Sequence, residues 1–152
     1  MYEMWRKNQK KVVAVSGGFD PVHIGHIKYF KEAKSLGDCL VVILNSDNFL
    51  KAKKSYVFMP FDERRMIIES IRYVDKVIPC IDEDQTVCKT LACLRPNIFA
   101  KGGDRTAENI PEYNVCKRLG IEMVFNVGGG KIQSSSWLVN ESKRFNKTKD
   151  NK

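Results

Sequence analysis

Five continuous apolar runs alternate with segments of helical period along this chain. The runs occupy residues 12–16, 38–44, 74–79, 97–100 and 121–125, and the helical segments occupy about 24–35, 60–73, 82–94 and 111–119. Strands that lack apolar and polar alternation are buried on both faces, as in a parallel sheet. The pattern therefore predicts an α/β fold of three layers, with helices on both faces of a five-stranded parallel sheet. The lysine-rich segment 51–54 is expected to be a loop.

The chain is expected to form one domain, residues 1–152. This length is enough for a proper core, and 43% hydrophobic with 29% charged residues is typical of a soluble globular protein. We expect the core over about 11–140 and a basic tail at 141–152. Residues 1–11 hold no apolar run before a cleavage-like site, and no stretch is long enough to span a membrane. A cytoplasmic location without membrane contact is expected.

The net charge of +8 is concentrated at the two ends of the chain. Residues 1–11 carry four basic and one acidic side chain, and residues 140–152 carry five basic and two acidic ones. Six of the eight net charges thus lie in segments typical of solvated tails rather than of a polynucleotide groove. Basic and aromatic residues are not interleaved as in an RNA-binding sheet. Nucleic acid is therefore not an expected partner.

The segment 17–26 contains the only two histidines of the chain, at the junction of the first predicted strand and the first predicted helix. Such a turn presents backbone N–H groups and the positive end of the helix dipole, and it binds anions such as phosphate. Residues three apart share a helix face, so His23 and His26 can point together at the anion. Gly25 between them leaves room for close approach. Two imidazoles can donate hydrogen bonds to oxygens that gain charge during phosphoryl transfer.

Two other interpretations of the histidine pair remain: a metal site, or two structural histidines. A metal site would need a third ligand of defined spacing, and no His or Cys cluster supplies one. The five cysteines are an odd number without a Cys-x-x-Cys pair, so they are expected to be reduced, mostly buried thiols. Nothing in the sequence favours a nucleophilic role for any of them.

The pattern Gly-x-Phe-Asp-x-x-His-x-Gly-His resembles the signature of the cytidylyltransferase-like nucleotidyltransferases. These enzymes join a nucleoside triphosphate to a phosphate monoester and release pyrophosphate. The resemblance covers about 11–140 and implies a Rossmann-like sheet of strand order 3-2-1-4-5. It also implies that the nucleotide is contacted by Gly18, Phe19, Asp20 and Gly25.

Two further segments resemble particular members of that family. The stretch 63–79 is similar to glycerol-3-phosphate cytidylyltransferases, in which arginines matched by Arg64 and Arg72 serve the nucleotide site; for Arg72, an exposed helix arginine is the alternative. The turn 101–104 follows the fourth predicted strand, at the edge where doubly wound sheets bind ligands. It resembles heptose 1-phosphate nucleotidyltransferases, and it implies nucleotide contacts by Lys101, Gly102 and Asp104.

A second glycine turn, 128–130, precedes a lysine and three serines. Glycines, a lysine and hydroxyls before a helix make a phosphate cradle, although such serines are by default helix N-caps. In the family a Ser-Thr-Thr segment here binds the nucleotide phosphates, which Ser134, Ser135 and Ser136 match. The glycerol-3-phosphate enzymes carry Arg-Thr-Glu-Gly before these hydroxyls. Lys131 can supply the charge of the missing arginine but not its bidentate geometry.

The resemblance implies in-line attack by an acceptor phosphate on the α-phosphorus of ATP or CTP. A phosphate monoester is already a nucleophile, so the protein positions the reactants and neutralises charge. We assign His23 and His26 to the α-phosphate, Lys53 and Lys131 to the triphosphate tail, and the three serines to the β- and γ-phosphates. Mg²⁺ accompanies the triphosphate, held mostly by its oxygens and water. A homodimer is also implied.

The identity of the acceptor stays open at this point. The turn 101–104 and the missing arginine favour a sugar phosphate of heptose 1-phosphate type, whereas Arg72 and its neighbours favour glycerol 3-phosphate with CTP. Pantetheine phosphate and flavin nucleotides are acceptors elsewhere in the superfamily. A nucleotide-binding regulator without turnover is a different class, and a nucleic-acid module, whose affinity would fall steeply with salt, is another.

Overall fold

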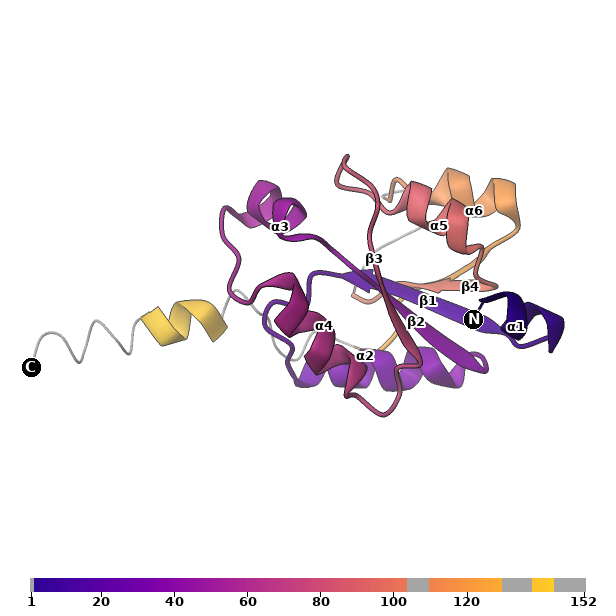
Figure 1. Cartoon of the computed structure of the whole chain (residues 1–152), viewed down its shortest axis with the longest axis horizontal. Coiled ribbons are helices and arrows are strands. Elements are labelled where there is room, and N and C mark those ends of the chain that lie inside the picture. Colours follow the sequence, from indigo (N-terminus) through magenta and orange to yellow (C-terminus); the bar gives the residue numbers. More distant parts are fainter. Residues whose placement is uncertain (1, 104–109, 130–137, 144–152) are drawn as a thin grey trace, which may run out of the picture.

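The computed structural model describes residues 2–103, 110–129 and 138–143. All five predicted strands are present and form one parallel sheet of order β3-β2-β1-β4-β5, which confirms the predicted fold. Figure 1 shows α2 and α4 on one face of this sheet and α5 and α6 on the other. The strands are β1 (Val12–Gly17), β2 (Cys39–Leu44), β3 (Lys76–Pro79), β4 (Ile98–Ala100) and β5 (Glu122–Val124).

Six helices of the described residues surround the sheet. They are α1 (Tyr2–Lys7), α2 (Ile24–Ser35), α3 (Asp47–Lys54), α4 (Phe61–Glu69), α5 (Cys88–Leu94) and α6 (Tyr113–Leu119). Residues 138–143 are helical as well. No helix of the described ranges combines the length and apolar character needed to cross a membrane.

Alternate residues of the central strand belong to two separate cores. Val13 and Val15 of β1 pack with Phe30 of α2, whereas Val12 and Ala14 pack with Leu91 of α5 on the other face. All six residues of β2 are buried. Burial on both faces is the reason that these strands carry continuous apolar runs.

The prediction of a loop at 51–54 was wrong, because these lysines form the last turn of α3. Ser46 caps the helix, its Oγ accepting from the Phe49 N–H at 3.0 Å. Only Leu50 of the helix is buried. It packs against Gly18, on which an added Cβ would lie 2.4 Å from the Leu50 Cδ2. A helix with a single buried anchor shows no apolar period, which is why the pattern along the sequence did not reveal it.

Several element boundaries also differ from the prediction. The helix expected from residue 82 begins at Cys88, and the Asp82 carboxylate caps it from outside by accepting the N–H groups of Lys89 and Thr90 at 2.7 and 3.0 Å. The helix expected over 60–73 ends at Glu69, the next strand starts at 76 rather than 74, and the helix expected from 111 starts at 113. The predicted boundaries differ from these by two to six residues.

The cysteines agree with the prediction of free, mostly buried thiols. Cys39, Cys80 and Cys116 are buried, Cys88 is half-buried and Cys93 is exposed. Burial raises the pKa of the Cys116 thiol to about 11. This thiol is therefore protonated at neutral pH and a poor nucleophile.

Candidate functional site

The two histidines stack at the start of α2. His23 is the N-cap, and its Nδ1 accepts the Gly25 N–H at 3.1 Å; His26 Nδ1 accepts the His23 N–H at 3.2 Å. The ring centroids are 3.7 Å apart, with 25° between the planes. Because each Nδ1 accepts a hydrogen bond, each neutral imidazole carries its proton on Nε2. Each ring thus carries its N–H on Nε2, at the N-terminal end of α2.

The surroundings of His26 keep it uncharged. Burial lowers its pKa from 6.5 to about 3, with a smaller contribution from His23. The Phe19 ring meets its imidazole edge-on at a centroid distance of 4.8 Å. At neutral pH His26 is therefore a fixed neutral donor, which suits an oxygen that becomes more negative during a reaction.

The lowered pKa of His26 predicts a loss of stability in acid. Unfolded, the residue binds a proton near pH 6.5, and folded only near pH 3. The unfolded state holds more protons between these values, so stability falls as the pH drops from about 6.5 toward 3, by up to about 1.4 kcal/mol per pH unit. We expect urea unfolding at about pH 7, 6 and 5 to show this slope.

The matched variant is His26→Gln, because glutamine at the third helical position can still accept the His23 N–H. The variant is expected to lose less stability than the wild type over the same pH range. Equal slopes in the two proteins would contradict the low pKa.

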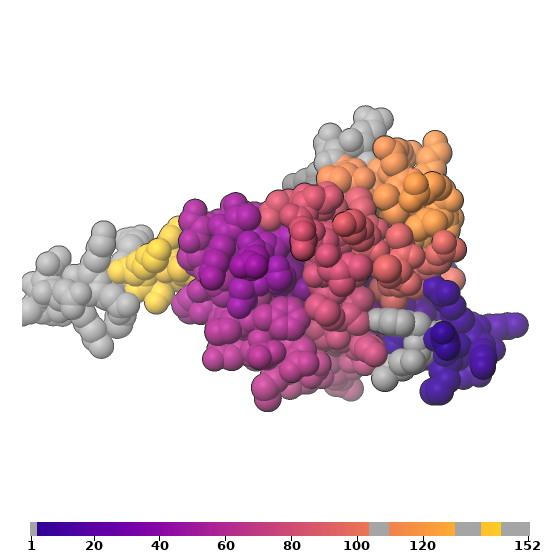
Figure 2. All heavy atoms as spheres, turned by 45° about the horizontal axis from the view of Figure 1, so that its top comes forward, coloured from indigo at the N-terminus to yellow at the C-terminus, as the bar shows by residue number. Residues whose placement is uncertain are grey.

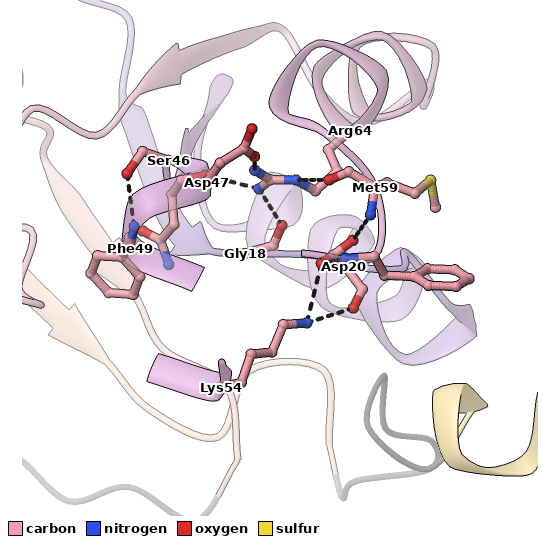
Figure 3. A network of polar contacts seen from close by, with 10 residues as sticks. Gly18, Asp20, Ser46, Asp47, Phe49, Lys54, Met59 and Arg64 are labelled. Atoms are coloured by element: carbon pink, nitrogen blue, oxygen red, sulfur yellow. Dashed lines mark hydrogen bonds and ion pairs between the residues drawn. The ribbon is translucent and has the colours of Figure 1, made fainter. Parts of the chain in front are cut away.

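Asp20 of the histidine segment is a structural anchor. Its side chain is about 1% exposed and forms an ion pair with Lys54 at 3.2 Å, and it accepts the N–H groups of Phe58 and Met59 at 2.7 and 2.5 Å (Figure 3). The expected nucleotide contact of Asp20 stays a prediction, and its oxygens bond the segment between α3 and α4. Asp20 ties that segment to the turn after β1.

Arg64 is also a structural anchor. Its side chain is 0% exposed and donates to the carbonyls of Met59 (2.9 Å), Gly18 (2.9 Å) and Asn45 (2.8 Å) and to Asp47 Oδ1 (2.7 Å) (Figure 3). The predicted nucleotide contact of Arg64 stays a prediction, and its guanidinium is wholly buried among these partners. Arg64 positions the turn after β1 against the end of β2.

Of the lysines in α3, the structure brings Lys54 to the histidine segment. Its Nζ donates to the Asp20 carbonyl at 2.9 Å and lies 4.7 Å from the centre of the Tyr56 ring. Lys53, which the sequence suggested, is on an exposed side of the helix. The spacing from Leu50 to Lys54 could have indicated this, because residues four apart share a helix face, but only if the segment had been recognised as helical.

The two glycine turns meet at α2. A Cβ on Gly102 would lie 3.8 Å from the Tyr29 ring, and one on Gly128 would lie 2.9 Å from the Tyr29 Cα. The Tyr29 hydroxyl donates to the Ala100 carbonyl at 2.5 Å. Tyr29 was missed by the sequence analysis, although it lies three residues after His26. Through it, the carboxyl ends of β4 and β5 reach the helix that carries the histidines, and Lys101 is buried beside them.

Arg72 does not join this site. It lies between α4 and β3, where the Asp75 N–H donates to the carbonyl of Leu40 near the amino end of β2, whereas the histidines follow the carboxyl end of β1. The predicted nucleotide contact of Arg72 stays a prediction, as does the alternative of an exposed arginine. The predicted residues Asp104, Lys131, Ser134, Ser135 and Ser136 lie outside the described residues.

A metal site at the histidine pair remains the alternative to an anion site. No three His, Cys, Asp or Glu side chains gather there as ligands. Each Nδ1 is already engaged by a backbone N–H. What the arrangement offers is donors for an anion.

Comparisons with known proteins found similar sequences and a similar fold. The family described as cytidylyltransferase-like matches residues 14–136. Bifunctional protein HldE of Aliarcobacter butzleri is 32% identical over 139 residues, which is 90% of this chain and 28% of that protein. Bifunctional protein HldE of Geobacter metallireducens is 38% identical over 124 residues, 79% of this chain and 25% of that protein. The chain therefore spans about a quarter of the length of these relatives.

A solved structure is similar as well. It is the crystal structure of the lipopolysaccharide core biosynthesis protein from Thermoplasma volcanium, with a TM-score of 0.66 and 27% sequence identity. The match covers 76% of this chain and 95% of that one.

Proposed function

This chain belongs to the cytidylyltransferase-like family of nucleotidyltransferases, and we propose that it transfers a nucleoside monophosphate from ATP or CTP to a sugar phosphate of heptose 1-phosphate type. The products are an NDP-sugar and pyrophosphate. The observation that carries the proposal is the stacked pair His23 and His26 at the start of α2, each with its Nδ1 accepting a backbone N–H.

In this reaction the protein positions the two reactants and neutralises the charge of their phosphates. An oxygen of the acceptor phosphate attacks the α-phosphorus, the bond from that phosphorus to the bridging oxygen breaks, and pyrophosphate leaves with the electron pair. The two Nε2–H groups donate to the α-phosphate oxygens as their charge grows. In this proposal the glycine turns after β4 and β5, which lie against Tyr29, would bring backbone close to the nucleotide.

The family resemblance supplies the roles of further residues in this proposal. Lys53 and Lys131 would neutralise the triphosphate, and the serines 134–136 would hold its β- and γ-phosphates. Mg²⁺ would arrive with the nucleotide and offset the charge of its phosphates, because it prefers phosphate oxygens and water to a cage of side chains. A homodimer is the expected assembly.

The sugar phosphate is favoured over its rival for two reasons. The turn at 101–104 resembles heptose 1-phosphate enzymes, and the relatives named above include a lipopolysaccharide core biosynthesis protein. The second candidate is a glycerol-3-phosphate cytidylyltransferase. The main local support for this second candidate was Arg72. That residue lies near the amino ends of the strands, whereas the histidines lie at the carboxyl ends.

The test is pyrophosphate release in Mg²⁺ with ATP or CTP, each paired with heptose 1-phosphate, with glycerol 3-phosphate and with no acceptor. We expect release with heptose 1-phosphate and one of the two nucleotides. Release only with glycerol 3-phosphate and CTP would establish the second candidate. Nucleotide binding without release from any pair would overturn the proposed reaction and favour a binding-only role.

A further inference from the structure

Tyr29 and Glu32 connect α2, the helix that carries the histidines, to the two glycine turns. Tyr29 lies three residues after His26, and Glu32 lies three residues further, so the three side chains follow one side of the helix. The Tyr29 hydroxyl donates to the Ala100 carbonyl at 2.5 Å, and the Gly128 N–H donates to the Glu32 carboxylate at 2.5 Å. Each glycine turn is thus bonded to α2 through one side chain.

The Tyr29 hydroxyl reaches β4 at the point where the sheet opens. Although β1 runs on to Gly17, its pairing with β4 stops at Ala14 and Phe99, one residue before Ala100. The side chain from α2 therefore bonds the β4 backbone where the pairing with β1 has ended. The opening between two such strands is where doubly wound sheets bind ligands.

The strand that accepts this bond is held from both faces of the sheet. Phe99 lies in one core with Leu91 of α5 and Cys116 of α6, the two helices on the face of the molecule that Figure 2 shows. Ala100 lies in the other core, against which Tyr29 packs. Because β4 is fixed in this way, its bond to the hydroxyl sets the position of α2.

The second glycine turn lies directly on the backbone of α2. Gly128 has a φ of +89°, and a Cβ there would lie 2.9 Å from the Tyr29 Cα, so only glycine fits. The Val127 N–H donates to the Lys101 carbonyl at 3.0 Å, which bonds the two turns to each other. Three hydrogen bonds therefore join α2, the turn after β4 and the turn after β5 in a closed ring.

We propose that Tyr29 and Glu32 are positioning residues, which hold His23 and His26 at a fixed distance from the two glycine turns. The inference rests on the proposed function, in which the histidines serve the α-phosphate and the turns lie against the nucleotide. Both side chains bond backbone groups and not the reacting atoms, so they act through the geometry of the site. A misplacement of about 1 Å can cost a factor of about 10² in rate.

The first test is Tyr29→Phe, which removes the hydroxyl and keeps the ring, alone and combined with His23→Asn. Asparagine can still cap α2 but lacks the proposed donor. We expect Tyr29→Phe alone to lower kcat for pyrophosphate release about tenfold or more. In the His23→Asn protein the same change should lower kcat only about threefold or less, because residues that act together are not additive. An equal factor in both proteins, or no effect, would overturn the inference.

Glu32→Ala and Glu32→Gln test the second connection. Alanine removes the acceptor of the Gly128 N–H, whereas glutamine keeps an amide oxygen that can accept it. We expect kcat to fall about tenfold in Glu32→Ala and to stay near the wild-type value in Glu32→Gln. Lys31→Ala, at the exposed neighbouring position of α2, is the matched control and should leave kcat unchanged. The same kcat in both Glu32 variants would contradict the role of this carboxylate.

A wild type without turnover would be a failure of the proposed function and not of this inference. Because His23 and His26 are the only histidines of the chain, their imidazole NMR signals report on the start of α2 without any reaction. We expect these signals to shift in Tyr29→Phe and Glu32→Ala and to stay in place in Lys31→Ala. Unchanged imidazole signals in Tyr29→Phe would overturn the inference, whether or not the wild type turns over.

Discussion

Replacing His23 by alanine is expected to lower kcat by about two to three orders of magnitude with the fold retained. The substitution removes one Nε2–H donor to the α-phosphate, and deletion of one such donor costs a factor of about 10²–10³ in other enzymes. The measurement is pyrophosphate release at saturating nucleotide and acceptor.

His23 has a second role that the same substitution disturbs, because its Nδ1 caps α2 by accepting the Gly25 N–H. Loss of an N-cap costs about 1 kcal/mol. His23→Asn separates the two roles, since asparagine is a good cap but places no donor at the Nε2 position. We expect this variant to unfold like the wild type and to be as slow as His23→Ala. Wild-type turnover in His23→Asn would show that His23 is only a cap.

Arg64→Met is expected to lower the free energy of unfolding by about 3 kcal/mol or more, because three backbone carbonyls lose their donor and each unsatisfied acceptor costs about 1–3 kcal/mol. The guanidinium is 0% exposed and bonds three carbonyls and the Asp47 carboxylate. Methionine replaces much of the stem volume but leaves these four acceptors without their donor. Since domains are stable by only about 5–15 kcal/mol, this variant is expected to be marginal. Urea unfolding measures the change.

The neighbouring residue supplies the control for Arg64. The Arg65 side chain is 46% exposed and lies 3.7 Å from Asp62, so Arg65→Met should change stability by no more than about 0.5 kcal/mol. Arg64→Lys keeps the charge, but one ammonium cannot reach all four acceptors, and we expect an intermediate loss. A loss below about 1 kcal/mol in Arg64→Met would contradict the anchoring role.

Much of the fold followed from local patterns. The apolar runs of β1 and β2 have no polar alternation because both faces are buried. The spacing of His23 and His26 placed their side chains together, and the structure confirms that they stack. The same patterns missed α3, in which a single residue is buried, and they placed the start of α5 six residues early.

The positions of Asp20, Arg64 and Arg72 were not predictable from local sequence patterns. The resemblance assigned all three to the nucleotide, but nothing along the chain indicates that Arg64 reaches Gly18, 46 residues away. Its four bonds depend on how α4 docks against the ends of β1 and β2. Arg72 follows the same helix, but because α4 runs along the sheet, Arg72 lies near the amino ends of the strands, away from the histidines.

The sequence alone determined the α/β class, the strand segments and the pairing of the two histidines at the start of one helix, because these depend on residue type and spacing over a few positions. Tertiary structure alone decided which charged groups face the site and which are buried as anchors, and it brought the two glycine turns to Tyr29 and Glu32 of α2. Burial and hydrogen bonding of a side chain depend on neighbours that come together only when the chain folds. Short-range periodicity of the sequence does not identify these neighbours.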